Sequence, residues 1–238
     1  MPTSPAPSLS LLLLKGVGAL LFFVSLTAGG KQYFQAFDEI APSDAPFLMP
    51  LCWNVAIFSA FALHHSVLAR TPMKRWLHAR VGPEAERSIY VVVASLLFLA
   101  STVLWQPLPG LWYALPGAWW YVGAAVQAAG VVVTLLAART LSVRELMGLA
   151  PPRRAAAGDV LETRGLYGLV RHPIYFGWLL FVGGAPVMTS TRLVFAVVSV
   201  AYLVLAIPFE ERSLVESFGT PYRDYQRQVR WRMMPGVY

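Results

Sequence analysis

The stretch Arg164-Gly-Leu-Tyr-Gly-Leu-Val-Arg-His-Pro-Ile-Tyr-Phe-Gly177, together with Glu210-Glu-Arg-Ser-Leu-Val215 further along, decides how this chain is organised. The segment between these two polar stretches is strongly apolar, with a turn expected at residues 188–192. In lipid we expect it to form a helical hairpin, because a helix satisfies its backbone polar groups internally. The two polar stretches then lie at the same end of the hairpin. We expect them to form a pocket whose walls come from the rest of the chain.

The composition is that of a membrane protein. The chain has 238 residues, of which 57% are apolar and 13% are charged, whereas about a quarter are charged in soluble domains. The apolar residues form long runs, not the short alternating segments of a barrel. We therefore expect an all-α polytopic membrane protein with one membrane domain, residues 1–238. Its single cysteine, Cys52, lies in an apolar run and is interpreted as a buried small hydrophobe.

About six membrane helices are expected, over residues 9–28, 47–68, 88–105, 118–138, 173–186 and 193–214. Gly29-Gly30 is expected to end the first helix, and Pro173 to begin the fifth. The fifth helix is short for a full crossing, and Pro208 is expected to kink or loosen the sixth near its end. Residues 1–138 thus hold four N-terminal helices, and residues 139–238 hold a polar stretch, the hairpin and a tail. Short interfacial helices are expected at residues 74–80 and 141–149, the second before a loop that begins at Pro151-Pro152.

The basic residues follow the connections between helices. The net charge is +7, and sixteen Lys and Arg fall after the second helix, after the fourth helix and in the tail. They are Arg70, Lys74, Arg75, Arg80, Arg87, Arg139, Arg144, Arg153, Arg154, Arg164, Arg171, Arg212, Arg223, Arg227, Arg230 and Arg232. The alternate connections hold only Lys31 and Arg192. By the positive-inside rule both termini are expected in the cytoplasm, and the charge marks topology, so no nucleic-acid partner is expected.

Three groups of reactive side chains are expected at the cytoplasmic face. Arg171, His172 and Tyr175 begin the fifth helix, and Glu210 and Glu211 lie near the end of the sixth. The third group, His64, His65 and Ser66, lies near the end of the second helix. Each group alone has a plain structural interpretation, as membrane-boundary arginines, ion pairs, packed histidines or interfacial tyrosines. Their expected convergence beside a helix N-terminus, whose dipole favours an anion, indicates a functional site.

The C-terminal part of the chain carries a set of spaced motifs. They are Arg164-Gly-x-Tyr167, Arg171-His-Pro-x-Tyr-x-Gly177, Glu210-Glu-x-x-Leu214, Phe218-Gly-x-x-Tyr222-x-x-Tyr225 and Pro235. This set resembles the C-terminal core of the isoprenylcysteine carboxyl methyltransferase family, a superfamily that also includes phospholipid methyltransferases. The resemblance implies S-adenosylmethionine as the cofactor. It places this molecule in a cytoplasmic pocket between the start of the fifth helix, the sixth helix and the tail. Residues 139–238 are then the cofactor-binding core.

The resemblance also implies roles for individual residues. Arg171 would pair with the methionine carboxylate, which suits a guanidinium fork, and Glu210 or Glu211 would accept hydrogen bonds from the ribose hydroxyls or the amino group. Tyr167, His172 and Tyr175 would line or position the adenosine. Pro173 and Tyr222 are assigned to the same cofactor site. No metal ligands are expected.

The N-terminal half carries a weaker resemblance. Leu63-His-His-Ser-Val-Leu-Ala-Arg70 and Glu86-Arg-Ser-x-Tyr90 are similar to the NnrU-like branch, and within it to bacterial methanethiol S-methyltransferases, which make dimethyl sulfide. This implies a small thiol as the methyl acceptor, with His64, His65 and Arg87 as the catalytic residues. Because a thiol reacts as the thiolate, either a histidine takes its proton or the nearby sulfonium and Arg87 lower its pKa. Residues 140–149 follow the pattern of that branch only loosely, which leaves the acceptor open.

The same residues allow other interpretations. The same chemistry could act on a prenylcysteine carboxylate or a lipid amine. Sterol reductases carry a related C-terminal core and use NADPH, although only scattered arginines could bind its phosphates here. An NnrU-like protein without enzymatic activity could use His64 and His65 to ligate a metal or haem, but adjacent histidines point to different faces of a helix. In each case the lipid bilayer is a partner, and the bacterial inner membrane is the expected location.

Overall fold

The computed structural model describes residues 8–68, 71–150 and 161–238, apart from the side chains of residues 67, 68, 71–75 and 83. The loop begun by Pro151-Pro152, together with Arg70, Arg153 and Arg154, lies outside the described residues, as do the side chains of Lys74 and Arg75. The chain divides into two compact units, and each is described by itself. Among the described residues, the first unit holds 8–32, 56–105 and 141–150, and the second holds 33–55, 106–140 and 161–238. A single domain over residues 1–238 stays a prediction.

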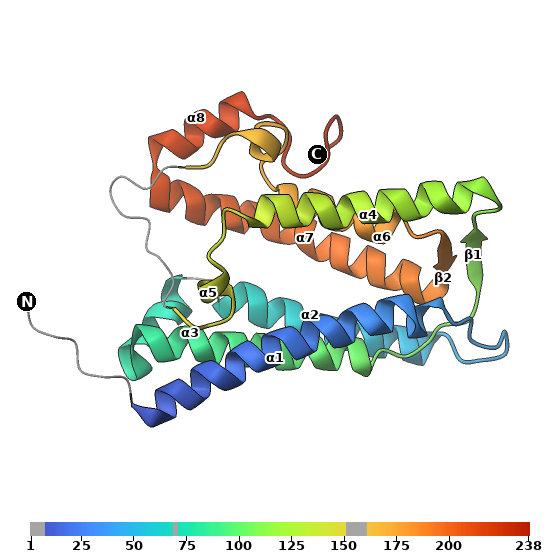
Figure 1. Cartoon of the computed structure of the whole chain (residues 1–238), viewed down its shortest axis with the longest axis horizontal. Coiled ribbons are helices and arrows are strands. Elements are labelled where there is room, and N and C mark those ends of the chain that lie inside the picture. The colour runs from blue at the N-terminus through green and yellow to red at the C-terminus, as the bar shows by residue number, and fades with distance from the viewer. Residues whose placement is uncertain (1–7, 69–70, 151–160) are drawn as a thin grey trace, which may run out of the picture. The chain divides into compact units, whose positions relative to one another are not determined.

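Within the described residues, five helices are long and apolar enough to cross a membrane. They belong to α1 (Leu9–Phe34), α2 (Leu48–Leu68), α3 (Thr71–Val103), α4 (Ala118–Ala138) and α7 (Ser190–Phe218) (Figure 1). A shorter apolar helix, α6 (Pro173–Gly183), precedes α7. These helices confirm the expected all-α polytopic membrane fold. The exposed fraction of Cys52 on α2 shows that the cysteine is not buried, contrary to our interpretation.

In the first unit, small residues let α1 approach α3. A Cβ on Gly29 would lie 3.0 Å from Cε1 of Phe98, so the ring packs directly on the glycine backbone. This contact explains why Gly29-Gly30 does not end the helix as predicted. Gly29 is a packing position inside α1, which continues to Phe34. Lys15 on α1 also forms an ion pair with Glu84 on α3.

The predicted helices over residues 74–80 and 88–105 merge into α3, which ends at Val103 and not at residue 105. The helix is interrupted at Gly82, whose φ of 77° and ψ of 166° are not helical. A positive φ of this kind favours glycine, which has no Cβ to clash. The short α5 (Val143–Leu146), capped by the hydroxyl of Ser142, occupies only the middle of the predicted helix over residues 141–149.

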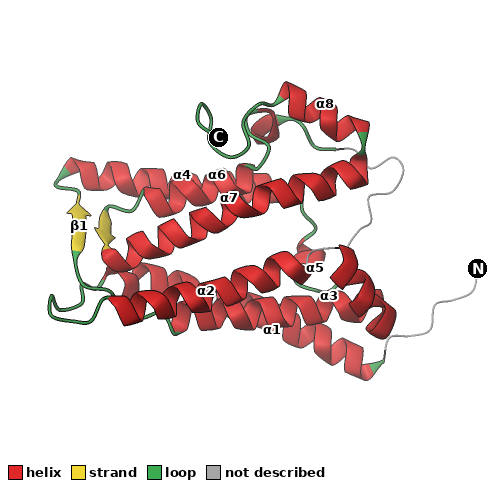
Figure 2. Ribbon diagram, turned by 180° about the vertical axis from the view of Figure 1, so that it is seen from behind, coloured by secondary structure: helices red, strands yellow, loops and turns green. Residues whose placement is uncertain are grey.

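In the second unit, α4 and α6 pack through glycines. A Cβ on Gly177 of α6 would lie 2.7 Å from the Gly130 carbonyl oxygen, and a Cβ on Gly130 of α4 would lie 2.5 Å from the Phe181 nitrogen. At Gly184, which follows α6, a Cβ would lie 2.7 Å from the Gln127 nitrogen. Such close backbone approach is typical of membrane helices that pack through small residues. Figures 1 and 2 show α4, α6 and α7 running along one another.

A two-stranded antiparallel sheet, which we did not predict, closes the turn of the hairpin. β1 (Leu111–Ala114) pairs with β2 (Val187–Thr189), both yellow in Figure 2. The backbone nitrogen of Leu115 also donates to the Pro186 carbonyl oxygen, at 2.9 Å. These hydrogen bonds replace helical ones, and this is why α6 ends at Gly183 and not at residue 186 as predicted.

The helix α6 is short, as expected. Its 11 residues rise only about 16 Å, whereas α7 covers about 30 Å between Ser190 and Glu210. Gly184 after α6 has a φ of −81° and a ψ of 1°, and only Val187–Thr189 form a strand before α7 begins. A full crossing of the bilayer by α6 stays a prediction.

Two further features of the second unit differ from the prediction. α7 begins at Ser190 and continues to Phe218, whereas residues 193–214 were expected. Pro208 lies inside α7, and the kink expected there stays a prediction. Beyond Gly219, the basic and aromatic tail forms α8 (Thr220–Gln228), which we did not expect to be helical. The short helices η1 (Ala36–Asp38) and η2 (Gly165–Gly168) complete the unit.

Candidate functional site

The two ends of the hairpin meet in the second unit. Nε of Arg171 donates to Oε1 of Glu211 at 2.6 Å, and Nε2 of His172 lies 3.4 Å from the same oxygen. Nδ1 of His172 lies 3.7 Å from Oε2 of Glu210. The hairpin thus brings residues some forty positions apart into one polar cluster, as expected for its two polar stretches.

The start of α6 holds the first part of this cluster. Pro173 occupies the first turn of the helix, where its fixed φ suits a helix start and its missing N–H leaves no donor unsatisfied. The backbone nitrogens of Arg171 and His172 donate instead to the carbonyl oxygens of Trp231 and Arg232, at 2.9 and 2.7 Å. The tail after α8 is therefore fastened across the start of α6.

Arg171 joins three parts of the second unit. Besides Glu211, its guanidinium Nη1 donates to the carbonyl oxygens of Val229 at 2.7 Å and Arg230 at 3.0 Å. The side chains of Arg171 and Glu211 are only 7% and 6% exposed. This pair is a buried ion pair that braces α6, α7 and the tail. Gln226 and Arg232 also approach Oε2 of Glu211, at 3.2 and 3.4 Å.

The neighbouring carboxylate is open to its surroundings. The side chain of Glu210 is 44% exposed, and the hydroxyl of Tyr175 donates to its Oε2 at 2.7 Å. The Tyr175 ring stacks on the His172 ring, with centroids 5.3 Å apart and planes 8° from parallel. The two adjacent glutamates therefore have different surroundings: Glu211 is buried in the fold, and Glu210 is available to a ligand.

The tyrosines of η2 and α8 pack next to this polar cluster. Tyr222 and Tyr225 are buried and pack with Val229, and the Tyr225 hydroxyl donates to the Tyr167 carbonyl oxygen at 2.7 Å. The Tyr167 hydroxyl reaches the Ala137 carbonyl oxygen at the end of α4, at 3.3 Å. Burial raises the pKa of the Tyr222 and Tyr225 phenols, and the Glu211 carboxylate raises that of Tyr222 further. Tyr222 is thus placed in the packed core under the polar cluster, with 2% of its surface exposed.

The first unit holds a second cluster around Tyr90. The hydroxyl of Tyr90 lies 2.7 Å from Nδ1 of His65, and the His64 ring stacks on the Tyr90 ring at 5.5 Å. The guanidinium carbon of Arg87 lies 5.1 Å from the centre of the same ring, while its Nε donates to the Glu145 carbonyl oxygen at 2.7 Å. Neither ring nitrogen of His64 has a hydrogen-bond partner within the part of the chain that the structure describes. The structure thus brings His64, His65 and Arg87 together around Tyr90, to which the sequence gave no role. The catalytic roles of the three side chains stay predictions.

The predicted site residues therefore form two groups. Tyr167, Arg171, His172, Pro173, Tyr175, Glu210, Glu211 and Tyr222 belong to the second unit, and His64, His65 and Arg87 belong to the first. Gln226, Arg232 and the tail carbonyls join the second group and were missed, because the resemblance links the tail to this site through Tyr222 but nothing in the sequence singles out these residues. Among the described residues, no group of three or more His, Cys, Asp or Glu side chains is arranged to hold a metal ion.

Comparison with known proteins gives the class. Residues 118–221, which run from α4 into α8, match the family profile described as phospholipid methyltransferase. A protein-S-isoprenylcysteine O-methyltransferase from Dictyostelium discoideum is 34% identical over 82 residues, which is 33% of this chain and 34% of that protein. Together with the membrane-spanning helices, these matches define an integral membrane methyltransferase, as the sequence predicted.

Longer matches give the family. Methanethiol S-methyltransferase 2 of Bradyrhizobium diazoefficiens is 35% identical over 181 residues, covering 74% of this chain and 70% of the relative. Methanethiol S-methyltransferase of Mycobacterium tuberculosis is 33% identical over 224 residues, covering 89% of this chain and 92% of the relative. The chain belongs to the family that these methyltransferases form. No solved structure matches it.

Proposed function

We propose that this protein uses S-adenosylmethionine to methylate a small thiol, with methanethiol as the substrate and dimethyl sulfide as the product. The observation that carries the proposal is the match to a methanethiol S-methyltransferase over 89% of the chain, which includes both polar clusters. We further propose that the protein lies in a bacterial inner membrane with both termini in the cytoplasm. The basic connections support this orientation through the positive-inside rule.

The polar cluster in the second unit has the donors and acceptors that this cofactor needs. The exposed Glu210 carboxylate can accept hydrogen bonds from ribose hydroxyls or an ammonium group. The stacked rings of His172 and Tyr175 provide an aromatic surface for the adenine. Nη2 of Arg171 makes no hydrogen bond to the described residues, so we assign it, with the partly exposed Arg232, to the methionine carboxylate.

Within this proposal the buried residues of the cluster act as supports. Glu211 holds the Arg171 guanidinium in one orientation through the 2.6 Å hydrogen bond, and the tail carbonyls hold its other edge. Tyr167 and Tyr222 hold the tail in place, since the Tyr167 carbonyl oxygen accepts from the Tyr225 hydroxyl and Tyr222 packs with Val229. Such fixed geometry matters because alignment of donor and acceptor supplies much of the rate in a displacement reaction.

When bound, S-adenosylmethionine supplies a methyl group on a positively charged sulfur. The residues of the first unit would prepare the acceptor, because a thiol has a pKa of about 8.5 and reacts as the thiolate. We assign His65 as the base. With its Nδ1 proton donated to the Tyr90 oxygen, its Nε2 has a free lone pair that can take the thiol proton. Arg87, beside the same tyrosine, would favour the thiolate through its positive charge.

The test uses purified protein with methanethiol and S-adenosylmethionine, and measures dimethyl sulfide in the headspace. Cofactor binding is measured separately by the thermal shift on adding S-adenosylhomocysteine. We expect His65→Ala to lower product formation by about a hundredfold or more while the shift remains, and Glu210→Gln to reduce the shift. If wild-type protein binds the cofactor analogue but makes no dimethyl sulfide, the thiol acceptor is wrong; if it shows no shift, the cofactor is wrong.

A second acceptor class is supported by the shorter match. The Dictyostelium discoideum relative is named for O-methylation of isoprenylcysteine, and the matching family profile for phospholipids. A prenylcysteine carboxylate or a lipid amine is therefore the alternative substrate for the same cofactor site. Transfer of a labelled methyl group to a prenylcysteine or to phosphatidylethanolamine, with none to methanethiol, would establish it.

A further inference from the structure

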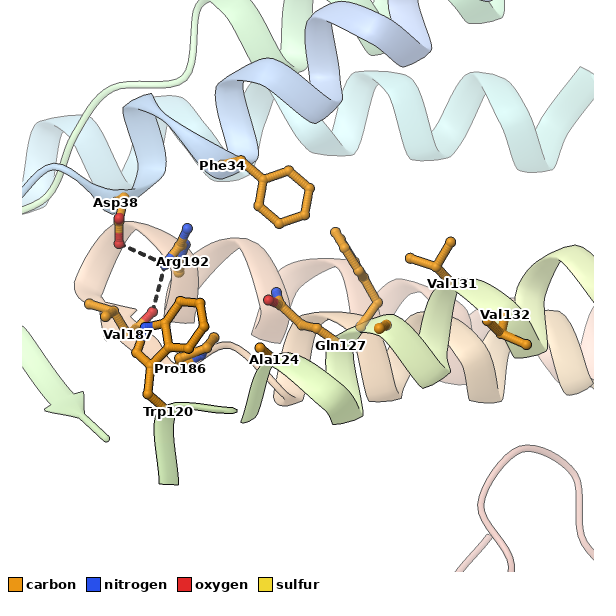
Figure 3. Close-up of a pocket in the computed structure, with 12 residues that line it drawn as sticks. Phe34, Asp38, Trp120, Ala124, Gln127, Val131, Val132, Pro186, Val187 and Arg192 are labelled. Carbon is orange, nitrogen blue, oxygen red and sulfur yellow. Dashed lines mark hydrogen bonds and ion pairs between the residues drawn. The ribbon is translucent and has the colours of Figure 1, made fainter. Parts of the chain in front are cut away.

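The second unit contains a cavity of about 600 Å³ that is separate from the residues proposed for methyl transfer. Its lining comes from α4, from Phe181 near the end of α6, from Pro186 and Val187 at the start of β2, and from Phe34, Asp38 and Arg192 (Figure 3). None of the twelve described lining residues is a predicted site residue. The cavity therefore needs an explanation of its own.

The body of the cavity is apolar and follows α4. Its wall on this helix includes Ala124, Ala128, Val131 and Val132, and Phe181 of α6 faces the same space. Ala124 and Ala128 lie one turn apart, and their small side chains leave the wall open. From Trp120 to Val132 the wall is about 18 Å long at the rise of an α-helix. Its length and apolar lining suit an extended hydrocarbon chain.

One end of the cavity is charged. Nη1 of Arg192 donates to Oδ1 of Asp38 at 2.7 Å and to the Val187 carbonyl oxygen at 2.8 Å, and Nη2 donates to the Tyr33 carbonyl oxygen at 3.1 Å. The Arg192 side chain is 6% exposed, yet its Nε is buried with no hydrogen-bond partner among the described residues. An unsatisfied guanidinium donor in a buried site calls for an acceptor oxygen from elsewhere.

The charges at this end are balanced. Arg192 is paired with Asp38, whose side chain is 47% exposed and presents its carboxylate to the surroundings. A ligand head that carries both a negative and a positive group can meet both side chains, whereas a purely anionic head would meet the Asp38 carboxylate unfavourably. The donor on Arg192 and the carboxylate on Asp38 thus select for a zwitterion.

We propose that this cavity is a binding site for a zwitterionic phospholipid of the surrounding bilayer. One acyl chain lies along α4 against Ala124, Ala128 and Val131. A phosphate or ester oxygen accepts a hydrogen bond from Nε of Arg192, and the ammonium group of the head lies near Asp38. The lipid is held as a structural ligand of the second unit, and the proposal does not depend on the identity of the methyl acceptor.

The test compares two double variants of α4. Ala124→Leu with Ala128→Leu fills the cavity, whereas Ala125→Leu with Ala129→Leu makes the same change at positions on the helix that do not line it. Each full-length protein is purified in detergent from phosphatidylethanolamine-rich membranes, and the retained lipid is quantified by native mass spectrometry and by extraction. Wild-type protein and the control variant are expected to retain one phospholipid per chain. The cavity variant is expected to retain roughly tenfold less, since the added leucines occupy the space of the acyl chain.

A second measurement tests which phospholipid head group the cavity prefers. Wild-type protein is reconstituted with an equal mixture of phosphatidylethanolamine and phosphatidylglycerol, and the retained species are identified. We expect preferential retention of phosphatidylethanolamine, and several-fold lower retention in Arg192→Lys, which keeps a cation for Asp38 but lacks Nε. The proposal is overturned if wild-type protein retains no phospholipid, if both α4 double variants lose it equally, or if phosphatidylglycerol or a free fatty acid is retained instead.

Discussion

The buried pair of Arg171 and Glu211 allows a quantitative prediction about the polar cluster. Arg171→Met keeps much of the side-chain volume but leaves the Glu211 carboxylate without the donor at 2.6 Å. Breaking a buried ion pair from one side costs about 3–5 kcal/mol, because a charge stays buried without its partner. Gln226 and Arg232 still approach the other carboxylate oxygen, at 3.2 and 3.4 Å. We therefore expect the low end of this range, about 3 kcal/mol.

A double-mutant cycle isolates the interaction. In Arg171→Met with Glu211→Gln both charges are absent, so the free energy of unfolding is expected to fall by less than the sum of the two single changes, by at least about 1.5 kcal/mol. The unfolding temperature of each purified variant is measured in the same detergent. The single Arg171→Met change is expected to lower it by roughly 6–12 °C. Arg223→Met on the exposed surface of α8 is the matched control, with little expected change.

The reasoning is refuted by either of two results. If Arg171→Met and the Arg223→Met control have the same unfolding temperature, Arg171 does not brace the cluster. If the effects of the two single substitutions add without coupling, the two side chains are not a buried pair in the folded protein.

The remaining predictions concern packing, pH dependence and catalysis. Gly177→Ala should lower the free energy of unfolding by about 3 kcal/mol, because the added methyl group would meet the Gly130 and Thr134 backbones. Gly183→Ala is the control and should not lower it, because a Cβ at Gly183 has nothing within 4 Å. Equal thermal stability of the two variants would contradict the close α4–α6 contact. Burial raises the pKa of Tyr222 and Tyr225, so above pH of about 10 the unfolded chain loses protons that the folded protein keeps. The stability from these two groups is thus present below that pH and is lost above it, and Tyr222→Phe should make the fall in unfolding temperature above pH 10 less steep, an effect that a pH series of melting curves measures. Tyr90→Phe should lower the turnover of methanethiol by about tenfold and leave the S-adenosylhomocysteine thermal shift unchanged, and His65→Ala should lower turnover by about a hundredfold or more. Full turnover in both variants would remove His65 and its hydrogen bond to Tyr90 from the mechanism.

The membrane fold could be predicted because lipid imposes simple rules on a sequence. Long apolar runs predicted α2 and α4 closely, since the length of a spanning helix is set by the thickness of the bilayer. Two polar stretches on either side of an apolar segment also predicted that Arg171 and Glu211 would meet. The two polar stretches can meet only if the apolar segment between them forms a hairpin that returns to its starting side. These inferences need no knowledge of side-chain packing.

Two local signals for where a helix ends were misread, because contacts with distant segments of the chain decide their effect. Gly29-Gly30 has the composition of a helix end, but within α1 Gly29 accommodates the ring of Phe98. The sequence of α6 continues to look helical up to Pro186, but pairing between β1 and β2 ends the helix at Gly183. In both cases a contact with a segment far along the chain outweighed the local preference.

The sequence by itself determined the membrane helices, the meeting of the hairpin's two ends and the residue types available for methyl transfer. Only the tertiary structure decided what each charged group does. It buries Glu211 against Arg171 while leaving the adjacent Glu210 exposed, and it places Arg192 with an unsatisfied nitrogen at the end of an apolar cavity. The physical reason is that the solvation and hydrogen bonding of a charged side chain depend on the segments that surround it, and those segments are distant in sequence.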